Sequence, residues 1–313
     1  MKKSLLTLII VCTVAVIGGI GMYTYQHQAL EINQTIAPIK QGDSTTIYAA
    51  YSADGSVSDY VISYLKALKE VSPNIIFITD NKIQRKEIKK LAAYTNQIIA
   101  QRHGEYDWGS FKRGVEILKQ NGWLANSDEA SKKAPLLILA NDSSLLVAPT
   151  LRPIFAEMSQ READFWGITA NEDGIYHLQS YFLVFTPKVY QSREFRSYLE
   201  TVKAEKDGLT VASRYEVPFT SYLENLGYKS SAYIPYKELS YLPLNDKNCY
   251  PLALLGKYNA PFLKMRTFTD RLNVQDSRRL VFHWIKEHNP QAYRELIAHL
   301  RKIKSPYLKE ARE

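Results

Sequence analysis

The sequence has few cysteines and fewer acidic than basic residues. Cys12 and Cys249 are the only cysteines among 313 residues, which excludes a disulfide framework and a zinc site built from cysteines. Lys and Arg number 40 against 32 Asp and Glu, but residues 264–313 alone hold 12 basic and 6 acidic side chains. Because most of the net charge of +8 lies in this tail, the composition argues against a generally basic protein and predicts no nucleic acid partner.

One long run near the N-terminus lacks charged residues. Residues 4–23 follow Lys2 and Lys3 and are long enough to cross a hydrocarbon core of about 30 Å as a helix. A cleaved signal peptide usually has a shorter apolar stretch followed by a small-residue site, which is missing. We therefore expect residues 1–29 to form a single-pass membrane anchor with its flank. The positive-inside rule favours a location of the remaining chain outside the cytoplasm.

Apolar runs and helix-spaced apolar stripes alternate after this segment. Strands of a parallel sheet covered on both faces are apolar throughout, and four such strands are expected at residues 45–51, 74–80, 97–100 and 135–140. Helices are expected between them at residues 57–71, 84–94 and 108–121. The alternation predicts an α/β fold with a mostly parallel sheet and right-handed crossovers.

The second half of the chain has a different pattern of expected strands and helices. Residues 164–169 and 177–185 predict an antiparallel pair of strands, and residues 219–226 and 232–235 predict a helix followed by a short strand. Residues 269–313 predict a basic helical tail. Two interpretations of the tail stay open: binding to an anionic membrane surface, or ordinary packing with a solvated basic face.

Polar residues follow three of the four expected parallel strands. Asp80 ends the second strand, Arg102 follows the third, and residues 141–143 (Asn-Asp-Ser) end the fourth. Ligands of open α/β sheets bind beyond the carboxyl ends of the strands, so these side chains predict a binding site. Each also has a structural explanation, since Asp80, Asp107 and Ser143 are good helix caps.

Several motifs occur in order along the chain. They are residues 106–109 (Tyr-Asp-Trp-Gly), 141–143, 164–169 (Asp-Phe-Trp-Gly-Ile-Thr), 177–185 (His-Leu-Gln-Ser-Tyr-Phe-Leu-Val-Phe), 215–216, 227–228 and 261–264. Together they resemble the rhamnan synthesis protein F family of polysaccharide-building proteins, and the resemblance runs from about residue 45 to residue 268. It implies that residues 30–268 form a mixed-sheet domain similar to the GT-A nucleotide-sugar glycosyltransferases, with flanking helices, between the anchor and the tail.

The resemblance also implies roles for individual residues. The donor-binding set is Asp80, Arg102, Tyr106, Asp107, Asn141, Asp142 and Ser143. Asp142 would ligate Mg²⁺ or Mn²⁺ against the diphosphate of a nucleotide-sugar donor. A metal site with one carboxylate binds a cation more weakly than a site with two. Metal-independent transfer therefore stays open, with Arg102 or Lys264 as the diphosphate partner.

Sugar transfer also needs a base for the acceptor hydroxyl and groups that hold the sugar. Glu216, which precedes a helix, is the first candidate for the base, and Asp164 is the second. Residues expected to bind the acceptor or the sugar are Trp166, His177, Gln179, Ser180 and Lys264. For the strand residues a structural polar network is an equal alternative.

Two functions follow from the resemblance. The first is a glycosyltransferase that moves rhamnose or a related deoxysugar from a nucleotide sugar to a polysaccharide or lipid-linked glycan, in bacterial cell-surface polysaccharide or lipopolysaccharide synthesis. The second is an inactive GT-A-like protein that binds glycan or scaffolds a membrane assembly. Bacterial nucleotide sugars are cytoplasmic, which conflicts with the orientation favoured above, so the side of the membrane stays open.

Overall fold

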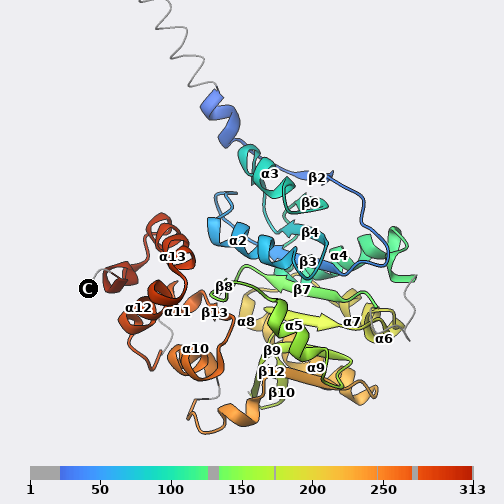
Figure 1. Cartoon of the computed structure of the whole chain (residues 1–313). Helices are drawn as coiled ribbons and strands as arrows, with labels where there is room; N and C mark the ends of the chain where they lie inside the picture. Colours follow the sequence, from blue (N-terminus) through green and yellow to red (C-terminus); the bar gives the residue numbers. More distant parts are fainter. Residues whose placement is uncertain (1–21, 126–133, 173, 245, 270–273, 312–313) are drawn as a thin grey trace, which may run out of the picture.

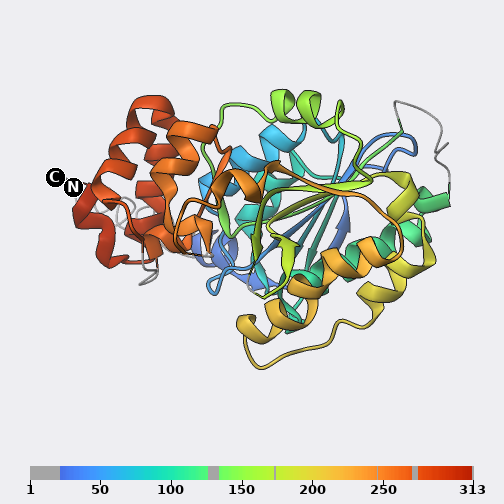
Figure 2. The same ribbon diagram turned by 90° about the horizontal axis from the view of Figure 1, so that it is seen from below.

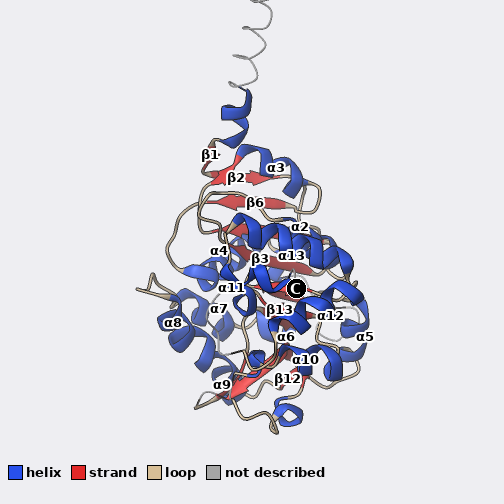
Figure 3. Cartoon of the chain, turned by 90° about the vertical axis from the view of Figure 1, so that its left-hand side faces the viewer, coloured by secondary structure: helices blue, strands red, loops and turns tan. Residues whose placement is uncertain are grey.

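The computed structural model describes residues 22–125, 134–172, 174–244, 246–269 and 274–311. A nine-stranded mixed sheet runs through the centre of this part of the chain (Figure 1). The strand order is β2-β6-β4-β3-β7-β11-β9-β10, and β12 pairs with β9 beside this path. Helices cover both faces of the sheet, as Figure 3 shows. The predicted α/β class and the mixed sheet with flanking helices are confirmed.

The four predicted parallel strands lie side by side in the sheet. They are β3 (Thr45–Ala50), β4 (Asn74–Thr79), β6 (Gln97–Ala100) and β7 (Leu137–Asn141). β3 is flanked by β4 and β7, and Ile47 is aligned with Ile76 on one side and Leu139 on the other. The helices between them are α2 (Asp59–Leu68), α3 (Arg85–Ala92) and α4 (Tyr106–Gln120). All four strands therefore end at the same edge of the sheet.

The antiparallel half differs from the prediction at one point. Residues 177–185 form two strands, β10 (Tyr176–Leu178) and β11 (Phe182–Phe185), and both pair antiparallel with β9 (Phe165–Glu172). The break falls at Ser180, whose backbone N–H donates to Glu216. The predicted last strand is β12 (Ser230–Ile234), which runs parallel to β9.

Short strands that the sequence did not predict complete the edges. β2 (Ile32–Thr35) pairs antiparallel with β6, and β1 (Ala29–Leu30) pairs with β5 (Ile83–Gln84). β8 (Ser144–Leu146) follows β7 directly and pairs antiparallel with β13 (Phe262–Lys264). This last pair brings residues more than one hundred positions apart to the edge where the parallel strands end.

Helices lie against both faces of the sheet (Figure 2), and two clusters of buried side chains hold them there. Tyr48 and Phe77 belong to the cluster under α2 and α5 (Arg152–Met158), whereas Ile47 and Ile76 belong to the cluster under α4, α7 (Arg193–Glu200) and α9 (Val217–Asn225). Successive residues of one strand point to opposite faces, so adjacent side chains enter different clusters. This alternation explains why these strands are apolar throughout.

The C-terminal residues form the helices expected there. They are α12 (Arg278–His288) and α13 (Pro290–Lys302), followed by a 3-10 helix (Pro306–Ala311). Asn289 caps α13 by accepting a hydrogen bond from the backbone N–H of Ala292 at 3.0 Å. Leu296 and Leu300 are fully buried in the same cluster as Tyr48. In Figure 1, α13 lies beside α2, and α12 and then α10 (Pro251–Tyr258) lie below α13. A domain boundary at residue 269 stays a prediction.

The predicted membrane anchor falls on residues 4–23, which lie almost entirely outside the described residues. From residue 22 onward, within the described ranges, the structure contains no helix that is both long and apolar enough to span a bilayer. This finding contradicts the predicted single-pass localisation.

Candidate active site

A cavity of about 430 Å³ lies at the carboxyl ends of the parallel strands, and we call it the strand-end cavity. Residues 208–216 close it from the other side. Residues from the sequence-based candidate set that line it are Asp80, Arg102, Tyr106, Asp107, Asn141, Asp142, Ser143 and Glu216. The first seven were expected to bind a donor, and Glu216 was expected to act as the base. The fold thus brings them to one place although they span more than 130 positions of sequence.

Asp80 anchors the loop that follows β6. One carboxylate oxygen accepts hydrogen bonds from the backbone N–H groups of His103 at 2.6 Å and Gly104 at 2.9 Å. The other lies 3.3 Å from Nη1 of Arg102, whose side chain is 60% exposed. Burial and the Arg113 guanidinium lower the pKa of His103 to about 4, so this imidazole is neutral at physiological pH. Asp80 therefore holds Arg102 at the cavity mouth and fixes the loop beneath it.

The first turn of α4 has an unusual backbone. Tyr106 has a φ of 56°, a left-handed conformation that is uncommon for residues other than glycine, and its side chain is 40% exposed in the cavity. Gly109 permits this turn, because a Cβ atom there would lie 2.2 Å from Cβ of Glu105. Asp107 points inward, and burial together with the Glu216 carboxylate raises its pKa to about 6.

The end of β7 is a compact hydrogen-bonded unit. Nδ2 of Asn141 donates to Oδ2 of Asp107 at 2.8 Å, while Oδ1 of Asn141 accepts from the Ser143 N–H at 3.1 Å and hydroxyl at 2.6 Å. Oδ2 of Asp142 accepts from the backbone N–H of Tyr51 at 2.9 Å. Burial raises the pKa of Asp142 to about 7, and the nearby Asp107 carboxylate adds to this increase.

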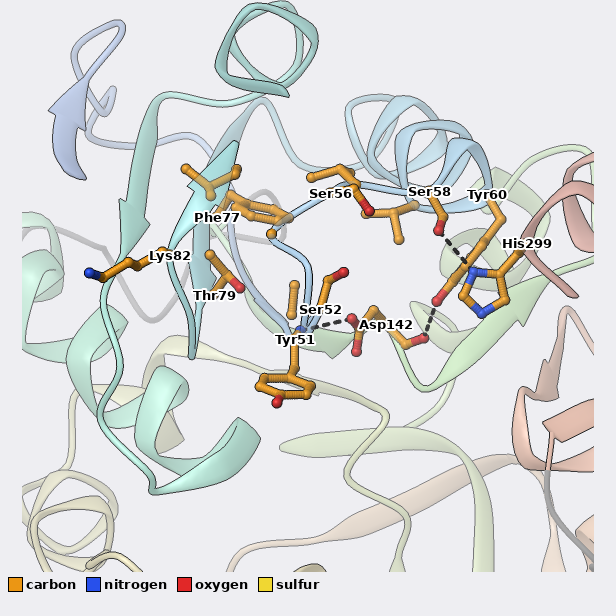
Figure 4. Close-up of a pocket in the computed structure, with 15 residues that line it drawn as sticks. Tyr51, Ser52, Ser56, Ser58, Tyr60, Phe77, Thr79, Lys82, Asp142 and His299 are labelled. Atoms are coloured by element: carbon orange, nitrogen blue, oxygen red, sulfur yellow. Dashed lines mark hydrogen bonds between the residues drawn. The ribbon is translucent and has the colours of Figure 1, made fainter. Parts of the chain in front are cut away.

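Asp142 also borders a second, small cavity of about 40 Å³, shown in Figure 4. Its backbone carbonyl accepts a hydrogen bond from the Tyr60 hydroxyl at 3.0 Å. His299, from α13, contacts the Ser58 hydroxyl at 2.8 Å and packs edge-on against the Tyr60 ring. The space between these polar groups is large enough for a water molecule. Asp142 is thus held from β3, from α2 and, through Tyr60, from the C-terminal helices.

Glu216 reaches the cavity from a π-helix (Ala212–Glu216) that precedes α9. Such helices are rare and frequently occur at functional sites. Oε2 of Glu216 accepts a hydrogen bond from the Ser180 hydroxyl at 2.8 Å, and Oε1 accepts one from the Ser180 N–H at 3.2 Å. The carboxylate is therefore held by the same residue at which the predicted strand is broken.

Lys264 lies beside this group. The pairing of β13 with β8 aligns it with Ser144, and its ammonium group lies 3.5 Å from the Ser143 hydroxyl and 4.3 Å from the centre of the Tyr181 ring. Burial lowers the pKa of Lys264, while the carboxylates of Glu216 and Asp107 act in the opposite direction. The structure thus places one cation near the carboxylates of Glu216 and Asp107.

Four predicted site residues do not join this group. Asp164 precedes β9, which runs in the same direction as β7, so it lies at the opposite edge of the sheet from Asp142. Its Oδ2 accepts from the Lys188 ammonium group and from the Lys229 N–H, both at 2.8 Å. These contacts give Asp164 a structural position away from the cavity.

The other three are buried in structural contacts. Trp166 packs edge-on against Phe155 at a ring distance of 5.1 Å. Nδ1 of His177 lies 2.9 Å from the carbonyl of Ile175. The side-chain oxygen of Gln179 accepts from the Thr169 hydroxyl at 2.6 Å and from Asn248 at 3.1 Å. Of the residues expected to bind the acceptor or sugar, only Ser180 and Lys264 therefore lie beside the base candidate.

Other cavity residues escaped sequence-based prediction. Tyr51 follows β3 directly, so the rule that identified Asp80 also applied to it. Gly208, Val211 and Ala212 come from a segment with no regular pattern, and the sequence carried no signal for their position.

The end of β7 offers few free oxygen atoms to a divalent cation. Both oxygens of Asp107 accept hydrogen bonds, and Oδ1 of Asn141 accepts two. Asp142 has one oxygen engaged by Tyr51, which leaves it as a single carboxylate. Within the described ranges, no group of three His, Cys, Asp or Glu side chains is placed to hold a metal ion. Because Mg²⁺ is usually bound through one or two carboxylates together with substrate phosphates, Asp142 alone would make a weak metal site.

Comparisons with known proteins complete this description. The uncharacterized protein y4gN of Sinorhizobium fredii is 22% identical over 259 residues, which cover 76% of this chain and 63% of that protein. A structure of 4-diphosphocytidyl-2C-methyl-D-erythritol synthase matches with a TM-score of 0.37 and 11% identity, over 61% of this chain and 88% of that one. Core-mannan synthase A of Aspergillus fumigatus, in its Mn/GDP form, matches with a TM-score of 0.27 and 12% identity, over 55% and 68%.

At these TM-scores neither solved structure assigns an activity to this chain. The family comparison is stronger, because the sequence model described as "Rhamnan synthesis protein F" matches residues 75–310. The match includes every candidate residue from Asp80 to Lys264. The chain belongs to the rhamnan synthesis protein F family.

Proposed function

We propose that the strand-end cavity binds a nucleotide-sugar donor and that the protein transfers the sugar to the hydroxyl group of a glycan. The observation that carries this proposal is the position of Glu216 in a cavity formed by Asp80, Asp142 and their neighbours. A transferase needs a donor pocket and a base that share one space. Membership of the rhamnan synthesis protein F family supports rhamnose or a related deoxysugar as the transferred group.

The strand ends supply the donor side of the reaction. In open α/β sheets a nucleotide lies across the carboxyl ends of the strands, where Asp80, Tyr51 and Arg102 line the cavity mouth. Tyr51 and Tyr106 offer aromatic faces for a base or a sugar, since both are partly exposed there. This arrangement corresponds to the donor half of a GT-A-like domain.

Glu216 supplies the acceptor side. In our proposal its carboxylate accepts the proton of the acceptor hydroxyl while the new bond forms between that oxygen and the sugar carbon. The two hydrogen bonds from Ser180, one to each carboxylate oxygen, orient the carboxylate for this step. Both oxygens of Asp107 accept hydrogen bonds, one of them from Asn141, so Asp107 is not our candidate for the base.

A protein that binds glycan without catalysis is the second candidate. The observation that favours it is the poor fit of a divalent cation at the end of β7. Such a protein would not need a base beside a nucleotide pocket, so the two candidates differ in what Glu216 does.

The deciding experiment uses the full chain with a panel of nucleoside diphosphate sugars. Binding is measured by isothermal titration calorimetry, and release of the nucleoside diphosphate is measured with water or an oligosaccharide as the acceptor. We expect at least one deoxysugar donor to bind and to be turned over. Binding of oligosaccharides without binding of any nucleotide sugar would reject the transferase and favour the glycan-binding protein.

A further inference from the structure

Lys264 lies beside the strand-end cavity and has no role in the transfer reaction proposed above. Its ammonium group lies 3.5 Å from the hydroxyl of Ser143, the last residue of the Asn-Asp-Ser segment that lines the strand-end cavity. We propose that Lys264 holds the leaving diphosphate of the donor and supplies the positive charge that a divalent cation provides in metal-dependent transferases. This inference rests on the proposed function.

The Lys264 ammonium group makes few hydrogen bonds within the described residues. An ammonium group has three donors. Within the described ranges, no carboxylate oxygen lies within 4.0 Å of it, and Ser143 is its hydrogen-bond partner at the long limit of 3.5 Å. The face of Tyr181 lies 4.3 Å away and stabilises the cation without using a donor.

The other cations nearby are already paired. Arg102 is engaged by the carboxylate and the carbonyl of Asp80, and most of its side chain faces solvent. Arg266 forms an ion pair with Asp246. Lys264 is therefore the basic residue beside the end of β7 whose charge is not committed to a direct ion pair in the described structure.

The position is also fixed by the backbone. β13 pairs with β8 over Phe262, Leu263 and Lys264, and the N–H of Met265 donates to the carbonyl of Ser143 at 2.8 Å. β8 continues from β7, so this pairing places Lys264 at the strand end that presents Asp142. A cation held on a paired strand needs little rearrangement when charge develops beside it.

The reaction then balances without a metal ion. The bond between the anomeric carbon and the diphosphate oxygen breaks, and its electron pair stays with the nucleoside diphosphate. The acceptor oxygen forms the new bond to that carbon, and its proton passes to Glu216. The negative charge that builds up on the diphosphate is stabilised by the Lys264 ammonium group, which keeps its own protons.

The test compares nucleoside diphosphates with the corresponding nucleosides. UDP, dTDP and GDP, and the matching nucleosides, are titrated into the full chain in the presence of EDTA. We expect a diphosphate to bind without metal. Lys264→Met should weaken diphosphate binding roughly 10- to 100-fold, because a charged hydrogen-bonding partner is lost, and leave nucleoside binding unchanged. Lys264→Arg should retain more of the diphosphate affinity than Lys264→Met, because it keeps the positive charge.

Lys257→Met is the matched control, because Lys257 also stacks on tyrosine rings. Those rings, of Tyr241 and Tyr258, do not line the cavity, whereas Lys264 contacts the lining residue Ser143. It should bind diphosphates like the wild type. Thermal melting of each variant shows whether it is folded. Diphosphate binding that EDTA abolishes and Mn²⁺ restores, or a folded Lys264→Met variant with wild-type affinity, would overturn the role of Lys264 while leaving the transferase intact. Failure of every diphosphate and nucleoside to bind would overturn both.

Discussion

Ser180 donates two hydrogen bonds to the carboxylate of Glu216, one from its hydroxyl at 2.8 Å and one from its backbone N–H at 3.2 Å. The two residues lie in different elements, at the break between β10 and β11 and at the end of the π-helix. Because each carboxylate oxygen has one donor, the plane of the group is fixed. The pair therefore couples the irregular strand to the proposed base.

Removal of the Ser180 hydroxyl should impair catalysis without affecting donor binding. We expect Ser180→Ala to lower kcat about 10-fold, because the carboxylate loses a charged hydrogen bond and its orientation. The affinity for nucleotide sugar, measured by calorimetry, should stay unchanged. Ser221→Ala is the control, since its hydroxyl donates to the carbonyl of Pro218 within α9. An equal loss of donor affinity and kcat would indicate a general structural role for Ser180.

The raised pKa of Asp142 predicts a dependence of stability on pH. A carboxyl group whose pKa is about 7 in the folded protein and about 3.9 unfolded favours folding when protonated, so it stabilises below pH 4 and this contribution is lost as the pH rises through 7. Asp142→Asn removes the titration. Between pH 5 and pH 8 the wild type should therefore lose at least about 1 kcal/mol more stability than the variant.

Chemical denaturation of the two proteins at both pH values measures this difference, because contributions of other titrating groups cancel in the comparison. Parallel stability curves for wild type and Asp142→Asn would show that this carboxyl group titrates normally in the folded protein.

Gly114 tests how tightly α4 packs on the sheet. A Cβ atom at this position would lie 2.5 Å from a methyl carbon of Ile47 on β3, so Gly114→Ala should destabilise the protein by about 1–3 kcal/mol. Gly256→Ala is the matched control, because no described atom lies within 4 Å of the added methyl group apart from the chain neighbours and the backbone of α10 itself. That variant should be more stable by about 0.5–1 kcal/mol, owing to the better helix propensity of alanine. Thermal denaturation distinguishes the two, and equal melting temperatures would contradict the packing.

Asp164 should affect stability more than catalysis. Asp164→Asn weakens the contacts with Lys188 and Lys229 at the edge of the sheet opposite the cavity, so we expect a lower melting temperature. With nothing changed beside Glu216, kcat should stay within about 3-fold of the wild type. A loss of activity of 100-fold or more in a folded variant would instead return Asp164 to the candidates for the base.

Much of the candidate site could be predicted from the sequence, because the positions of its residues depend on local patterns. Each parallel strand is a continuous apolar run, and the residue after it must lie at the carboxyl edge, which located Asp80 and Asn141. Glu216 was located by the resemblance to the family. Pairings between distant segments carry no comparable signal, so neither the β8–β13 pair nor the contact of His299 with Ser58 could be predicted.

The strand expected over residues 177–185 shows a second limit. Its composition suits a strand throughout, yet it is broken at Ser180 because the backbone N–H there bonds to Glu216 instead of a neighbouring strand. The partner lies 36 positions away. Similarly, Asp164 and Trp166 belong to a motif that resembles the family but lie at the far end of β9, where their contacts are structural.

The most direct test of the account is the rate of nucleoside diphosphate release by the full-length Glu216→Gln variant, with the donor affinity of the same protein. Glu200→Gln, on the exposed face of α7, is the control. We predict unchanged donor affinity and a kcat lowered by about 10²- to 10⁴-fold, as expected for loss of a general base. A folded Glu216→Gln variant that turns over donor at the wild-type rate would contradict the proposed site.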